Sequence, residues 1–153
     1  MSLHEEVEML RRVPLFAEIE PAELKLIAFT SERITFDPGQ YVFHQGDVGD
    51  AAYIIMEGDA DVVIESPSGA RSVAQVGRNE LIGEIAILCD KPRTASIRAR
   101  SRLVTLRISK DMLFRLLTEF PKMLLSIMRV IARRLENTTD QCGNANGNKG
   151  LAS

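Results

Sequence analysis

The chain has 153 residues, 45% of them hydrophobic, and a formal net charge of −2. This length suits one domain with a substantial core, and the charge argues against direct binding of nucleic acid, which needs a surplus of Lys and Arg on one face. The sequence has no apolar run near the roughly 20 residues of a membrane span and no basic-then-apolar leader, so we expect a cytoplasmic protein that does not contact membranes.

Two short helices are expected within residues 2–30. Ser2 and Glu5 have the spacing of a capping box at the start of the first helix, and Pro14 is expected to close that helix. Pro21 stands at the first position of the second helix, where its fixed backbone angle is favourable. The apolar face of the second helix is expected to comprise Leu24, Ile27 and Ala28.

Residues 33–108 are predicted to form an antiparallel β-barrel or jelly roll. β-branched and aromatic residues fill several short runs, and turns rich in Gly, Pro and Asp separate them. Short strands at such spacing favour a sandwich or jelly-roll barrel, which limits exposed sheet edges. The predicted strands are Arg33–Phe36, Tyr41–His44, Ala52–Met56, Ala60–Glu65, Arg71–Val76, Thr94–Ala99 and Leu103–Ile108.

Helical spacing returns after Ser109, which is a candidate N-cap. Residues 109–139 are predicted to form a C-terminal helix pair, and Pro121 starts its second, long helix. Residues 1–140 are therefore expected to form one domain of the α+β class, mainly β. The polar, glycine-rich residues 141–153 are predicted to be a flexible tail.

The segment between the predicted strands ending at Val76 and starting at Thr94 contains residues suited to binding a phosphate and a sugar. Gly83 allows a close backbone approach, and a short helical turn after it would leave N–H groups free to face an anion. Arg93 can pair with two phosphate oxygens through its planar fork, and Glu84 offers acceptors to a ribose hydroxyl. A 3′,5′-cyclic nucleotide presents both groups. The alternative is a simple salt bridge between Glu84 and Arg93 in an empty barrel.

The same segment resembles the phosphate-binding cassette of cyclic-nucleotide-binding domains. That cassette reads Gly-Glu-aliphatic-small-aliphatic-aliphatic, a short insert, and then Pro-Arg-Ala/Thr/Ser-Ala. This chain has Gly83-Glu84-Ile85-Ala86-Ile87-Leu88 and then Pro92-Arg93-Thr94-Ala95. An upstream signature of the family is similar to Val42-Phe43, Gly46-Asp47, Gly49, Tyr53-Ile54-Ile55-Met56 and Gly58, with Ala52 in place of a larger aliphatic residue. The resemblance covers about residues 10–140.

The resemblance implies a set of ligand-binding residues. Glu84 would accept a hydrogen bond from the ribose 2′-hydroxyl, and Arg93 would pair with the phosphate oxygens. Backbone N–H groups would also face the phosphate or the sugar. The cassette residues implied at the ligand are Gly83, Glu84, Ile85, Ala86, Arg93, Thr94 and Ala95.

The end of the chain resembles the dimer helix of the bacterial catabolite-activator (Crp/Fnr-type) branch of the family. A pair of hydroxyl residues there touches the adenine of cyclic AMP, and Thr138 and Thr139 stand at the matching positions. The resemblance therefore implies cyclic AMP as the ligand, with cyclic GMP as the other candidate, because a hydroxyl such as that of Thr94 occurs with both. The likeness stops after Asn144, so we expect no DNA-binding domain in this chain.

A homodimer is expected from the apolar pattern of the long C-terminal helix. Four residues recur at spacings of four, three and four, as in the seam of a coiled coil. The alternative is that this stripe packs on the barrel. The four residues are Leu124, Met128, Ile131 and Leu135.

The leading hypothesis is a non-enzymatic sensor that needs no cofactor or metal and signals through its C-terminal helix, with a separate effector protein as a further partner. One alternative is a degenerate barrel that serves only as a dimerisation or interaction scaffold. Another is a small jelly-roll enzyme, but hydrolysis of a cyclic phosphate needs a metal or a positioned base. Two histidines and two cysteines in the whole chain are a small supply of metal ligands.

Overall fold

The computed structural model describes residues 2–17, 19–129 and 131–133. The chain divides into two units, Met1–Arg115 and Leu116–Ser153. The first unit contains the N-terminal helices, the β-sheets and the first part of helix α4, Lys110–Glu119, and the second contains the rest of α4 and the described helical residues after it. No helix among the described residues is long and apolar enough to cross a membrane.

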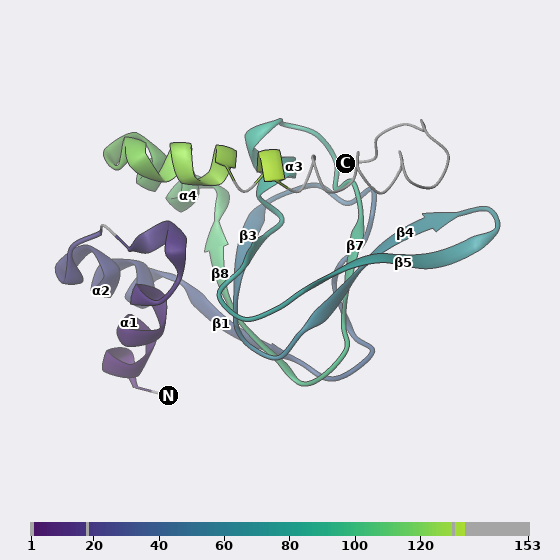
Figure 1. The fold of residues 1–153 in the computed structure, drawn as a ribbon, viewed down its shortest axis with the longest axis horizontal. Helices are drawn as coiled ribbons and strands as arrows, with labels where there is room; N and C mark the ends of the chain where they lie inside the picture. Colours follow the sequence, from purple (N-terminus) through teal and green to yellow (C-terminus); the bar gives the residue numbers. More distant parts are fainter. Residues whose placement is uncertain (1, 18, 130, 134–153) are drawn as a thin grey trace. The chain divides into compact units, whose positions relative to one another are not determined.

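The N-terminal helices form where the capping signals predict them. Helix α1 spans Leu3–Arg11, and the backbone N–H of Glu5 donates to Ser2 Oγ at 3.2 Å. The N-cap at Ser2 is therefore confirmed, and the Glu5 carboxylate accepts from the Ser2 hydroxyl at 3.3 Å, in place of the backbone N–H that a full capping box uses. The helix ends before Pro14, which instead starts the short 3₁₀ turn η1, Pro14–Phe16. Helix α2 spans Pro21–Thr30 with Pro at its first turn, as predicted, and α2 packs against α1 and contacts strand β8 (Figure 1).

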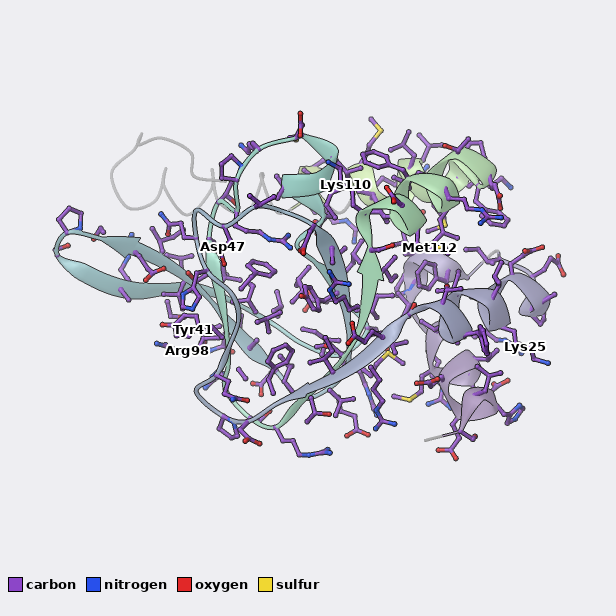
Figure 2. All side chains as sticks on the ribbon, turned by 180° about the vertical axis from the view of Figure 1, so that it is seen from behind. Lys25, Tyr41, Asp47, Arg98, Lys110 and Met112 are labelled. Carbon is purple, nitrogen blue, oxygen red and sulfur yellow. The ribbon has the colours of Figure 1, made fainter. Side chains whose placement is uncertain are left out.

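The strands form two antiparallel sheets, in agreement with the predicted jelly-roll class. One sheet has the order β1-β8-β3-β6 and the other β2-β7-β4-β5. Tyr41 of β2 pairs with Arg98 of β7, and the two side chains lie next to each other in Figure 2. The strands among the described residues are β1 Glu32–Phe36, β2 Tyr41–Phe43, β3 Ala51–Glu57, β4 Ala60–Ser66, β5 Gly69–Val76, β6 Leu81–Ile82, β7 Ser96–Ala99 and β8 Leu103–Ser109.

Two strand predictions differ from the structure at the ends of the cassette segment. The short strand β6 was not predicted, because two residues are too few to show a β-periodicity; it pairs with Tyr53 and Ile54 of β3. Thr94 and Ala95 lie outside β7, which starts at Ser96. The reason is that ladder pairing of β7 with β4 begins at Ser96, whereas Arg93 pairs instead with the loop after β2.

The core lies between the two sheets, since both supply its residues. Strand β3 is buried from Ala51 to Met56, and it lies between β8 and β6 in its sheet. The β4–β5 hairpin extends away from the core (Figure 1), and β5 is exposed except at Val76. The buried cluster comprises Ala51, Tyr53, Ile55, Ala60, Val76, Ile82, Ile97, Ala99 and Leu103.

The C-terminal helices begin where they were predicted. Helix α4 spans Lys110–Glu119, and the backbone N–H of Met112 donates to Ser109 Oγ at 3.2 Å, so Ser109 is its N-cap. Helical structure starts again at residue 121 and includes residues 121–129 and 131–133. The predicted positions of Leu135, Thr138 and Thr139 and of the tail 141–153 lie outside the described residues.

Candidate functional site

The predicted helical turn after Gly83 is present and is built around that glycine. Gly83 has φ +84° and precedes the short helix α3, Glu84–Leu88. A Cβ on Gly83 would lie 2.7 Å from Arg93 Nη1 and 3.1 Å from the ring of Phe43. Glycine therefore serves two purposes here, because it accepts a left-handed backbone conformation and lets the arginine approach.

The side chain of Arg93 is buried and held by backbone carbonyls. Its residue exposure is 4%, and Nη1 donates to Gly83 O while Nη2 donates to Ala51 O, both at 2.7 Å. Its Cζ lies 4.0 Å from the centroid of the Phe43 ring, a cation–π distance. The cassette turn, strand β3 and the end of strand β2 together fix the orientation of the guanidinium.

The charge of Arg93 is only partly compensated. Burial lowers the pKa of Arg93 from its usual value, and the charges of nearby groups, among them Asp50 and Glu84, oppose that shift. The guanidinium stays protonated, since arginine is not deprotonated in proteins. The Asp50 carboxylate is 3.9 Å from Arg93 Nη2, but its side chain is 67% exposed, and it also accepts a hydrogen bond from Arg107 at 3.2 Å.

One donor of the Arg93 guanidinium, Nε, is buried without a hydrogen bond in the described part of the chain. Among the described residues, nothing accepts a hydrogen bond from its buried Nε. A buried donor without a partner costs about 1–3 kcal/mol. An anion with two oxygens would both satisfy this donor and balance the charge, which is the chemistry of a phosphate site.

Glu84 and Ala86 are buried residues of the cassette helix α3. Glu84 is 2% exposed at the first position of α3, and Ala86 is 5% exposed. A Cβ on Gly49 would come within 2.5 Å of the Ala86 Cβ. The loop after β2 therefore packs directly on the cassette helix, and Gly49 makes that approach possible.

The loop after β2 also forms hydrogen bonds with the backbone of Arg93. Gly46 N donates to Arg93 O, and Arg93 N donates to Asp47 O, both at 2.9 Å. Asp47, labelled in Figure 2, also accepts a hydrogen bond through its carboxylate from His44 N at 3.0 Å. Gly46 and Asp47, which belong to the upstream signature of the sequence, are therefore hydrogen-bonded to the backbone of Arg93.

The structure brings the predicted cassette residues into two adjacent groups joined by the bond from Arg93 to Gly83. The first group forms the turn and α3, and the second precedes β7. Sequence reasoning missed Phe43, Ala51 and Asp50 as contacts of Arg93; an apolar or acidic residue more than 40 positions away carries no local signal of such a contact. The two groups are Gly83, Glu84, Ile85 and Ala86, and Arg93, Thr94 and Ala95.

The known proteins to which this chain is similar agree with one another in family. The family described as "Cyclic nucleotide-binding domain" matches residues 33–120, more than half of the chain. A cAMP-dependent protein kinase regulatory subunit of Blastocladiella emersonii is 38% identical over 109 residues, which cover 71% of this chain and 27% of that protein. A CRP-like cAMP-activated global transcriptional regulator of Mycobacterium tuberculosis is 28% identical over 134 residues, covering 87% of this chain and 60% of that protein.

The fold agrees with these relatives. The crystal structure of Thermus thermophilus catabolite activator protein matches with a TM-score of 0.72 and 29% identity, covering 81% of this chain and 59% of that one. The chain thus spans less than two thirds of the length of each of these three proteins. From the matched residues and the fold, this chain belongs to the cyclic nucleotide-binding domain family, with both protein kinase regulatory subunits and CRP-like regulators among its relatives.

Proposed function

We propose that this protein is a non-enzymatic sensor that binds cyclic AMP in the cassette. The observation that carries the proposal is the buried Arg93, oriented by two carbonyls and with its Nε donor unmatched among the described residues. A cyclic phosphate offers one negative charge and two oxygens to this fork. The relatives named for cAMP activation or dependence support the choice of ligand.

The remaining cassette residues have complementary roles in this proposal. Glu84 accepts from the ribose 2′-hydroxyl, and the backbone N–H groups of Gly83, Ala86 and Thr94 face the phosphate or sugar. Ile85 and Ala95 line the site. Binding of this kind involves no bond cleavage and needs no cofactor, and the regulatory names of the relatives favour a sensor over an enzyme.

Isothermal titration calorimetry with cyclic AMP, cyclic GMP and 2′-deoxy-cyclic AMP tests the function. We expect cyclic AMP to bind about tenfold more tightly than cyclic GMP, since a mispaired buried group costs about 1–3 kcal/mol and the hydroxyls of Thr138 and Thr139 would accept from the adenine amino group. The 2′-deoxy analogue should also bind at least tenfold more weakly, because hydrogen bonds to charged groups contribute about 1.5–3 kcal/mol.

Each ligand in this panel tests a different part of the proposal. Equal binding of the 2′-deoxy analogue would remove Glu84 from the ribose role. Tighter binding of cyclic GMP would contradict the argument from the two threonines. If neither cyclic nucleotide binds, the sensor proposal fails and the alternative of a scaffold without ligand is favoured.

We further propose a homodimer through residues 121–139. Leu124 and Met128 are 41% and 56% exposed in the single chain, which supports an apolar seam that a second copy covers. Ile131→Lys should give a monomer with the sheets still folded, because the charge would be buried unpaired at the seam. Light scattering after size-exclusion chromatography measures this mass.

The neighbouring Ala132 provides a matched control for that substitution. It is exposed on the same helix and lies outside the seam, so Ala132→Lys adds the same charge and should leave the dimer intact. A monomeric wild-type protein, or a monomer from both variants, would contradict the proposed seam.

Signalling would follow from the effect of ligand binding on the conformation of the protein. A ligand that prefers one arrangement of the cassette and C-terminal helix increases the population of that arrangement. A separate effector protein would then recognise the helix. A cytoplasmic location, as expected from the sequence, is part of this proposal, because cyclic AMP would have to reach the site in that compartment.

A further inference from the structure

A closed polar network lies where the loop after β2 meets strands β4 and β7. It is formed by Gln45 of the loop, Glu65 near the end of β4 and Ser96 at the start of β7. Ser96 is fully buried, with 0% exposure. None of these three residues belongs to the cassette contacts described above.

The hydrogen bonds of this network form a ring. Ser96 Oγ donates to Glu65 Oε2 at 2.6 Å and accepts from Gln45 N at 2.8 Å. The side chain of Gln45 closes the ring, since its Oε1 accepts from Glu65 N at 2.7 Å and its Nε2 donates to Glu65 O at 3.4 Å. The short bond from Ser96 to a carboxylate is charge-assisted and therefore among the stronger kinds.

This ring is continuous with the backbone that carries Arg93. Gln45 directly precedes Gly46 and Asp47, whose backbone groups bond both N and O of Arg93 at 2.9 Å. Ser96 follows Arg93 by three residues. The network therefore ties the loop and the arginine segment together just beyond their own pair of backbone bonds.

The side chain of Arg93 depends on that backbone position. Its two bonds to carbonyls of Gly83 and Ala51 are 2.7 Å long, and hydrogen bonds weaken steeply when distance or angle departs from such values. A small displacement of the segment would move the fork relative to both carbonyls. Loss of the ring would therefore change the position of the Arg93 guanidinium without any substitution of Arg93 itself.

We propose that Ser96, Glu65 and Gln45 are positioning residues that set Arg93 for a cyclic phosphate. The inference rests on the proposed function, and it adds residues outside the cassette to the determinants of affinity. Ser96 is central, because its hydroxyl is both a donor to β4 and an acceptor for the loop. Glu65 supplies the charge that makes the shortest bond.

The test is a double-mutant cycle read by cyclic AMP binding. Ser96→Ala is expected to weaken binding about tenfold, within the range of coupling between residues of one network. In an Arg93→Ala background, with ligand raised to millimolar levels and binding followed by ligand-observed NMR, the same change should cost less than about twofold. Gln45→Ala, at the half-buried loop position, provides a second variant should Ser96→Ala fold poorly.

The matched control is Thr105→Val. Thr105 is also 0% exposed, and its hydroxyl donates to Ile34 O at 2.9 Å, so this variant removes a buried hydroxyl of the same domain away from Arg93. It should lower the melting temperature and leave cyclic AMP affinity unchanged. Glu65→Gln keeps an oxygen acceptor and should lose less affinity than Ser96→Ala.

The outcomes separate this inference from the proposed function. If the wild-type protein binds cyclic AMP and both Ser96→Ala and Gln45→Ala bind equally well, the positioning role is wrong. It is also wrong if the loss persists in the Arg93→Ala background or if Thr105→Val loses as much affinity. A wild-type protein that binds no cyclic nucleotide overturns the proposed function itself, and the positioning role with it.

Discussion

Arg93→Ala should weaken cyclic AMP binding by more than tenfold and leave the protein folded. A buried, hydrogen-bonded charge contact of this kind is worth about 2–5 kcal/mol when one partner is truncated. Arg93 Nη1 and Nη2 are already committed in part to Gly83 O and Ala51 O, so the fork is held in place before a ligand arrives. Such preorganisation lowers the entropy lost on binding.

Folding should survive because removal of the side chain also removes a buried charge that is only partly compensated. The cost of leaving two carbonyls without their donors is offset by the loss of the unmatched Nε and of the desolvated guanidinium. Calorimetry measures the affinity, and circular dichroism with thermal melting measures the fold and its stability.

Two further variants define what Arg93 contributes. Arg93→Lys keeps the charge and loses the planar fork, so its affinity should lie between those of wild type and Arg93→Ala. Arg78→Ala is the control, since Arg78 also donates from its guanidinium to a backbone carbonyl, that of Met56 at 3.2 Å, but does so in the turn after β5. It should bind normally. An unchanged affinity in Arg93→Ala would contradict the phosphate role.

The elements that sequence reasoning placed correctly are those set by neighbouring residues. The N-cap at Ser2, the proline start of α2 and the N-cap at Ser109 each involve groups within a few positions of one another. The turn at Gly83 is also local, because only a glycine readily adopts its φ of +84°. These features depend on backbone geometry that the local sequence alone determines.

The features that escaped prediction depend on distant pairing. The Ala51 carbonyl that holds Arg93 is 42 positions away in sequence, and it becomes a partner only because β3 lies beside the cassette turn. The bond between Ser96 and Glu65 joins residues 31 positions apart. A backbone carbonyl has no side-chain identity to recognise, so no residue pattern could indicate the first contact.

Gly83→Ala should weaken cyclic AMP binding about tenfold or more, because a misplacement of about 1 Å in a binding group is enough for losses of this size. A methyl group at this position would lie 2.7 Å from Arg93 Nη1, which is too close for a non-bonded contact of a Cβ, so the guanidinium must move. Its bond to Gly83 O would be lost or distorted. The left-handed backbone would cost roughly 1–2 kcal/mol in addition.

Gly39→Ala separates these two effects. Gly39 has φ +91°, close to that of Gly83, but a Cβ there would meet no atom within 4 Å. It lies in the turn between β1 and β2. Gly39→Ala should therefore lose only the stability that the left-handed backbone costs, Gly83→Ala should lose at least as much, and only Gly83→Ala should lose affinity.

A combined variant decides whether the added methyl acts through Arg93. Once the guanidinium is removed by Arg93→Ala, the nearest remaining atom to a Cβ at position 83 is on the Phe43 ring, at 3.1 Å, which a small shift can relieve. Gly83→Ala should then cost little further affinity in that background, so the two losses would be strongly non-additive. Additive losses would mean that Gly83 supports the ligand through its own backbone instead, and full affinity in Gly83→Ala alone would show that the close approach of Arg93 is not required for binding.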